Sequence, residues 1–134
     1  MRILFWILLA SAAIVSCSKR EEKLVSGDDA PIAGRWIYKQ RFWSPGAGGS
    51  WNAVPTADQA IIEFTADGRF SYSPNFDKAS LLFDRYRRDS NVVTVSSTAN
   101  ANVEKWYIQY IDNQQLDISL MTCFEGCPYR FIRN

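Results

Sequence analysis

The chain has 134 residues with 15 basic and 14 acidic side chains, so its charges nearly balance, and it contains no histidine. A balanced surface lacks the basic footprint of nucleic-acid-binding proteins, which argues against a nucleic-acid partner. Without histidine, neither a Ser-His nor a Cys-His pair can form, and close cysteines lack further soft metal ligands. These features predict a protein that is not an enzyme and holds no metal or cofactor.

The first seventeen residues have the organisation of a targeting segment. Arg2 supplies a positive charge, residues 3–13 are an apolar run too short to span a bilayer, and Ile14-Val15-Ser16-Cys17 follows. This tetrapeptide resembles the lipobox of bacterial lipoproteins. The resemblance implies cleavage before Cys17 and lipidation of its thiol and new amino group. It also implies anchoring in the bacterial cell envelope, at the outer membrane, on its periplasmic face or the cell surface.

The number of cysteines agrees with an oxidising compartment. The chain has three, and lipidation of Cys17 leaves Cys123 and Cys127 as an even pair. Their C-F-E-G-C spacing closes a very small loop, so a disulfide there would be a local staple worth about 2 kcal/mol. A metal site and a redox pair are the alternatives, although active dithiols usually have C-x-x-C at a helix start.

The composition changes at Gly34. Residues 18–33 are rich in charge, Gly and Pro, which predicts a flexible tether. From Gly34 on, short alternating segments are separated by turn residues, a pattern typical of an all-β domain. The sequence therefore predicts a signal peptide over residues 1–16, a lipidated cysteine and tether over 17–33, and one β domain over 34–134.

Eight strands are predicted in this domain. Their ranges are 34–43, 60–65, 69–73, 81–88, 92–96, 103–111, 115–121 and 129–133. Asp67-Gly68 is a strong hairpin signal, and the later connections are also short. Sequential hairpins favour an eight-stranded antiparallel up-and-down meander barrel, with a β-sandwich as the alternative.

A family resemblance rests on three motifs. Gly34-Arg35-Trp36 looks like the G-x-W motif that opens lipocalins, and Arg130 or Arg133 lies near the closing strand, where lipocalins have an Arg that packs on this Trp. The F-x-x-D-G-x-F hairpin (64–70) and the C-x-x-G-C turn (123–127) are similar to those of small lipocalin-like lipoproteins of Gram-negative bacteria. The resemblance implies a lipocalin-like barrel with a long loop that crosses its open mouth.

Alternation predicts which side chains face the barrel interior. On the first predicted strand these are Trp36, Tyr38, Gln40 and Phe42. On the sixth, over residues 103–111, they are Trp106, Ile108 and Tyr110. An eight-stranded barrel is filled by side chains or holds one small ligand. If it holds one, the predicted ligand-binding residues are Trp36, Tyr38, Tyr72, Tyr86, Trp106 and Tyr110.

The loop over residues 44–59 is the other candidate site, because hairpins normally use two to five residues. Trp43 and Trp51 bracket its glycine-rich tip. Three roles are open for this loop: a lid over the barrel mouth, a loop that binds a partner, or a surface loop without a binding role. Two functions follow: binding of a small apolar or amphipathic ligand in the barrel, or a protein-interaction module of the envelope, such as an accessory subunit or a hydrolase inhibitor.

Overall fold

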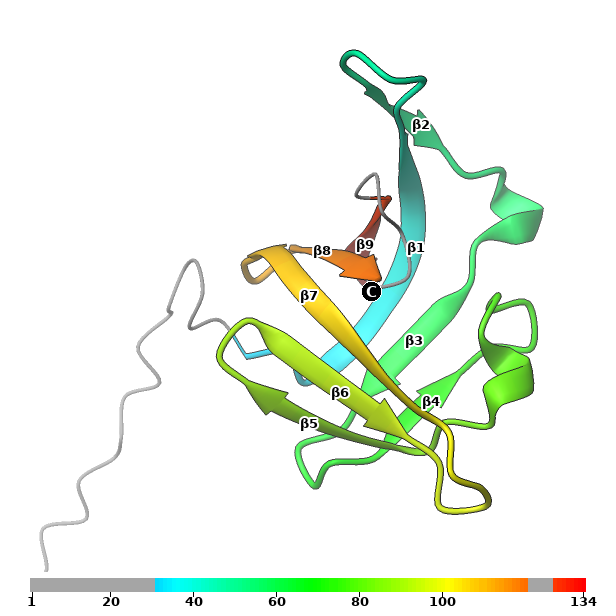
Figure 1. The fold of residues 1–134 in the computed structure, drawn as a ribbon, viewed down its shortest axis with the longest axis vertical. Coiled ribbons are helices and arrows are strands. Elements are labelled where there is room, and N and C mark those ends of the chain that lie inside the picture. The colour runs from blue at the N-terminus through cyan, green and yellow to red at the C-terminus, as the bar shows by residue number, and fades with distance from the viewer. Residues whose placement is uncertain (1–30, 121–126) are drawn as a thin grey trace, which may run out of the picture.

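The computed structural model describes residues 31–120 and 127–134, which build one curved antiparallel sheet (Figure 1). Its strands are β1 (Gly34–Trp43), β2 (Ser50–Ala53), β3 (Ile61–Phe64), β4 (Phe70–Tyr72), β5 (Arg85–Asp89), β6 (Val92–Ser96), β7 (Val103–Ile111), β8 (Gln115–Leu120) and β9 (Pro128–Arg133). Two short 3-10 turns, η1 (Thr56–Asp58) and η2 (Ala79–Leu81), interrupt the connections. Within the described ranges, no helix has the length and apolar character needed to cross a membrane.

The strands follow one another around a barrel. They pair in the order β4-β3-β1-β9-β8-β7-β6-β5, and β2 pairs with β1 outside this path. The seam between β4 and β5 is joined by two backbone hydrogen bonds, from Phe70 N to Asp84 O (3.0 Å) and from Tyr86 N to Gly68 O (2.9 Å). The predicted eight-stranded antiparallel up-and-down barrel is therefore confirmed, with a nearly closed seam.

The turn residues explain the meander. Gly68 has a φ of +85° in the hairpin between β3 and β4, a conformation that side chains other than glycine rarely adopt. In the hairpin between β7 and β8, the Asp112 carboxylate accepts the backbone N–H groups of Gln114 and Gln115, both at 2.7 Å. These local bonds fix the direction in which each strand returns.

Alternating side chains fill the interior. Alternate positions on β3, β4, β6 and β8 are buried, namely Ile62, Phe64, Phe70, Val93, Val95, Leu116 and Ile118, and Tyr72 and Leu120 are partly buried against them. Trp36 and Trp106 are the largest fully buried side chains. Burial of this apolar surface is the main stabilising contribution of the fold.

Two β-bulges reverse the predicted alternation. The pairing of β1 with β9 shifts between Tyr38 and Gln40, and that of β7 with β8 shifts between Ile108 and Tyr110. Each bulge inserts one residue, so the side chains beyond it change faces. The prediction that Phe42 and Tyr110 point inward is therefore wrong: Tyr110 is 44% exposed and Ile111 is buried in its place.

The end of the barrel at Gly34 is sealed. Ile32 is buried in the core, and its carbonyl accepts the Trp36 indole N–H at 2.8 Å. The Arg133 guanidinium lies 4.1 Å from the centre of the Trp36 ring and donates to the carbonyls of Ala33 (2.9 Å) and Pro31 (3.1 Å). The packed domain thus includes the residues just before Gly34, and Arg133 is the arginine that covers the tryptophan.

Two predicted segments differ from the structure. The loop over 44–59 contains β2, which pairs with residues 40–43 of β1 and extends it into a hairpin that rises above the barrel (Figure 1). This hairpin therefore does not form a lid across the mouth of the barrel. Residues 81–84 are not strand: Leu82 has a left-handed φ of 57°, and the Leu81 carbonyl accepts the Asn102 side-chain amide at 2.9 Å.

Candidate functional site

A cleft of about 380 Å³ lies at the end of the barrel opposite Gly34. Its lining comes from β1, β2, β9 and two connections: Tyr38, Arg41, Tyr129, Ala60, Asp58 and residues 52–55 and 75–77. Because β2 and η1 stand on one side and the connection after β4 on the other, the cleft opens at the mouth of the barrel.

Aromatic rings form the floor of this mouth cleft. The Tyr38 ring lies 5.2 Å from that of Tyr129 and 5.4 Å from that of Phe131, between ring centres. Phe76, from the connection after β4, is buried beside them. Tilted aromatic contacts of this kind hold the rings in place and leave apolar faces toward the cleft.

The rim carries charges of both signs. The Tyr129 hydroxyl donates to Asp77 at 3.2 Å, Asp58 lies on the η1 side, and Arg41 extends from β1. The β1 bulge places Arg41 on the cleft side, where alternation had predicted Gln40 and Phe42. An aromatic floor below a charged rim suits a molecule with an apolar ring and a polar end.

The two floor tyrosines hold their protons strongly. Burial is the main reason why the pKa of Tyr38 is raised from 10.0 to about 12, and Tyr129 and Asp77 add to the rise while Arg41 opposes it. Burial, followed by Asp77, likewise raises the pKa of Tyr129 to about 12. Both side chains are thus neutral phenols across the physiological pH range.

We expect the fold to lose stability as the pH rises from about 10 to about 12. Unfolded tyrosines release their protons near 10.0, whereas Tyr38 and Tyr129 keep theirs to about 12, so the unfolded state binds fewer protons in this window and is favoured. Urea unfolding at about pH 9 and about pH 11 measures the loss, and Tyr38→Phe is expected to make it smaller. Equal stability at the two pH values would contradict this assignment.

Most of the predicted lumenal residues belong to the packed core. Below the mouth cleft lies a void of about 10 Å³, roughly the space of one water molecule. Trp36 and Trp106 are fully buried, and the hydroxyls of Tyr72 and Tyr86 donate to the carbonyls of Ala79 (3.1 Å) and Thr65 (2.7 Å). Of the six predicted ligand-binding residues, Tyr38 lines the cleft.

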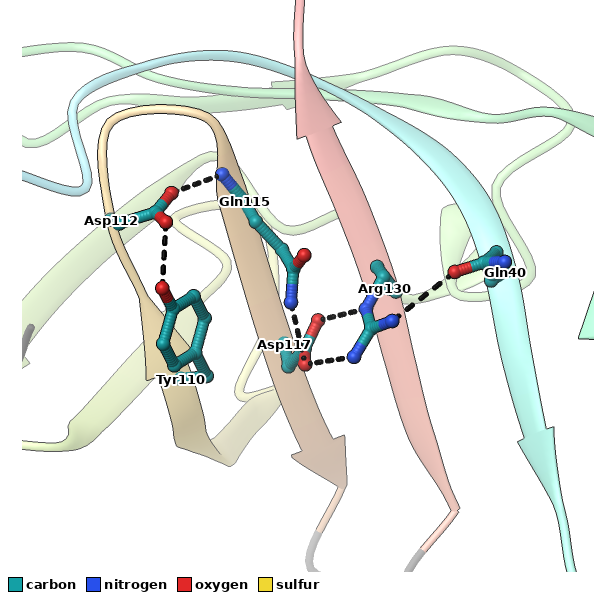
Figure 2. Close-up of polar contacts among 6 residues, drawn as sticks. All are labelled: Gln40, Tyr110, Asp112, Gln115, Asp117 and Arg130. Atoms are coloured by element: carbon teal, nitrogen blue, oxygen red, sulfur yellow. Dashed lines mark hydrogen bonds and ion pairs between the residues drawn. The ribbon is translucent and has the colours of Figure 1, made fainter. Parts of the chain in front are cut away.

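The remaining predicted site residues lie outside the lumen. Tyr110 is on the outer face and donates to Asp112 at 2.7 Å (Figure 2). Trp43 is 58% exposed at the end of β1, and Trp51 packs on the outer wall against Arg130. Neither tryptophan covers the mouth.

Sequence reasoning missed the polar half of the cleft. Arg41, Asp58 and Asp77 were not predicted, because a bulge and two irregular connections bring them together. Cys17 and Cys123 lie outside the described residues. The lipidation of Cys17 and the disulfide between Cys123 and Cys127 therefore stay predictions. Cys127 directly precedes β9.

Searches among protein-family models, curated proteins and solved structures found no match to this chain. The strand order and the cleft define the structural class of the protein, a nearly closed antiparallel β-barrel with a cleft at its mouth.

Proposed function

We propose that this protein is an envelope-anchored binding protein, without enzymatic activity, that holds a small amphipathic molecule in the mouth cleft. The cleft carries the proposal. Its volume of about 380 Å³ falls within the roughly 300–1,000 Å³ of small-molecule sites. The packed core below it favours a ligand whose apolar ring rests on Tyr38 and Tyr129 over a chain that enters the lumen.

The direction of β1 supports an anchored arrangement. β1 begins at the sealed end and runs to the mouth, so an anchor at Cys17 would attach to the sealed end. The cleft would then face away from the membrane and be open to molecules in the surrounding compartment. In that oxidising compartment, we propose a disulfide between Cys123 and Cys127.

We further propose that the chain is a divergent lipocalin-like lipoprotein. The stacking of Arg133 on Trp36, 4.1 Å from the ring centre, supports this kinship. In the lipocalin resemblance, an arginine near the last strand packs on the tryptophan of the G-x-W motif. The meander order of the eight barrel strands agrees with it. Fold alone does not define a ligand, so the proposal depends on the cleft.

Mass spectrometry of the full chain from membranes of its own host tests the function. We expect an intact mass that includes acyl groups on Cys17, and under native conditions a retained small molecule. Ala53→Phe should reduce retention, because Ala53 lines the cleft and is exposed there, so a phenyl ring would take up part of the ligand's space. Ala57→Phe is the matched control, an exposed alanine of η1 outside the cleft lining.

Two results would contradict the proposal. The first is a clean ligand-free mass that persists after incubation with an extract of host lipids and metabolites. The second is equal retention by Ala53→Phe and by the native chain. An unmodified Cys17 would separately refute the anchor.

A protein-interaction module of the envelope is the second candidate. The observation that favours it is the projecting β1–β2 hairpin, whose Trp43 is 58% exposed (Figure 1). Large exposed aromatic side chains are enriched where proteins bind one another. Crosslinking from position 43 in host cells, with and without Trp43→Ser, distinguishes this function from ligand binding.

A further inference from the structure

A second hollow lies on the outer face of the sheet, separate from the mouth cleft. It has a volume of about 260 Å³. The hairpin supplies two aromatic walls, β9 supplies a proline, and β7 and β8 supply polar side chains; the lining is Phe42, Trp51, Pro128, Gln109, Asp117 and Ser119. We call it the outer groove.

The walls of the outer groove are held in position. Phe42 and Trp51 pair across β1 and β2, with ring centres 5.5 Å apart and edge to face. The Arg130 guanidinium lies 3.8 Å from the centre of the Trp51 ring. Arg130 is fixed in turn by two hydrogen bonds from Nε and Nη2 to Asp117, at 2.9 and 2.8 Å (Figure 2). The groove is therefore preorganised.

The floor carries no net charge. Asp117 is a buried carboxylate, and Arg130 neutralises it through a bidentate ion pair while Gln115 Nε2 donates to it at 3.1 Å. Three donated hydrogen bonds leave capacity for one more, because a carboxylate offers about four acceptor positions. A charged ligand would find no unpaired counter-charge on this floor.

Ser119 contributes a hydroxyl to the lining of the outer groove. It is 8% exposed, and its hydroxyl has no hydrogen-bond partner among the described residues. Every fully enclosed side-chain polar atom in those residues has a partner, so this hydroxyl retains contact with the solvent of the groove it lines. A buried hydroxyl that faces a groove with free donor and acceptor capacity is a polar group available to a ligand.

We propose that the outer groove binds one neutral sugar ring of an oligosaccharide. The C–H face of a sugar ring is apolar and packs on Phe42, Trp51 and Pro128, while its hydroxyls both donate and accept. They can donate to Asp117 and exchange hydrogen bonds with Ser119 and Gln109. The volume lies below that of sites for drug-sized ligands, which suits one ring.

The donor balance favours a sugar over a polyproline peptide. Proline has no backbone N–H, so a polyproline segment offers acceptors only. It would leave the remaining acceptor position of Asp117 and the acceptor capacity of Ser119 unsatisfied. A sugar hydroxyl satisfies both.

Fluorine NMR of the full chain, labelled with 5-fluorotryptophan in a detergent without a sugar headgroup, tests the proposal. The probes are maltotriose, cellotriose, chitotriose and a polyproline peptide, and Trp51→Phe assigns the Trp51 resonance. At least one trisaccharide is expected to shift that resonance saturably, with a Kd on the order of 1–10 mM, while Trp36 and Trp106 stay unshifted.

Matched variants identify the contact. Ser119→Ala is expected to weaken binding about five- to tenfold, whereas Ser96→Ala, on β6 away from the groove, leaves it unchanged. If Ser119→Ala lowers the melting temperature, Gln109→Ala replaces it, because Gln109 is exposed at the β7 bulge. The proposal is overturned if no trisaccharide shifts Trp51 at about 50 mM, if only polyproline does, or if these variants bind as the native chain does.

Discussion

Replacing Trp106 by alanine is expected to lower the free energy of unfolding by about 3–5 kcal/mol. The Trp106 ring is fully buried, with the rings of Phe70, Phe76 and Phe83 at 5.5, 6.1 and 6.4 Å between centres. Truncation removes these contacts and leaves a cavity that rigid strands cannot close. It also removes the indole N–H that donates to Glu104 at 3.1 Å. A domain with a total stability of about 5–15 kcal/mol would lose much of its margin.

Trp43→Ala is the matched control, because it makes the same chemical change at a side chain that is 58% exposed. Its effect is expected to stay within about 0.5 kcal/mol. Denaturant unfolding of the full chain in mild detergent, followed by circular dichroism, measures both. Similar losses for the two variants would contradict the packed core.

This result determines how ligand binding must be tested. A ligand lost from Trp106→Ala would report unfolding, because the residue supports the barrel and does not line the mouth cleft. Rim substitutions such as Ala53→Phe change the cleft while the core stays intact. Because the lumen is packed, the core and the cleft can be altered by different substitutions.

The barrel could be predicted because its information is local. Apolar residues alternate along β6 as Val93 and Val95, and Asp67-Gly68 specifies the hairpin between β3 and β4. Once the turns are short, a meander is the simplest way to pair the strands. The prediction of the fold therefore required no long-range information beyond closure of the last strand on the first.

The bulges could not be predicted from alternation alone, since one inserted residue changes the face of everything beyond it. On β7 a signal was present: Ile108 and Ile111 are both buried but three residues apart, a spacing that a regular strand cannot bury on one face. On β1 the polar run 39–41 carries no such signal. The missed strand β2 lies in a glycine-rich segment, where only the aromatic residues Phe42 and Trp51 indicated pairing.

The outer groove was missed for a different reason. Alternation along β8 puts Asp117 on the outer face, where a carboxylate is expected to be hydrated. Its burial arises because Arg130 on the neighbouring strand β9 pairs with it and the hairpin brings Trp51 against Arg130, a contact between residues far apart in sequence. Residues that alternation assigns to solvent and the structure buries are the positions where function is most difficult to predict.

The glycine of the G-x-W motif leads to the second large effect. Gly34 has a φ of +143°, which side chains rarely adopt, and an added Cβ would collide with Arg133 Nη1. Gly34→Ala is therefore expected to cost about 3 kcal/mol, the sum of backbone strain and of the displaced guanidinium that bonds Ala33 and Pro31 and stacks on Trp36.

Gly46→Ala separates the two contributions, because Gly46 has a φ of +127° and nothing lies within 4 Å of an added Cβ. We expect Gly34→Ala to exceed it by about 1–2 kcal/mol in denaturant unfolding, and this excess to vanish in an Arg133→Met background, where no guanidinium remains to be displaced. Equal costs at the two glycines in the native background would show that the motif glycine serves backbone geometry alone. An excess that persists without Arg133 would mean that another neighbour requires the glycine.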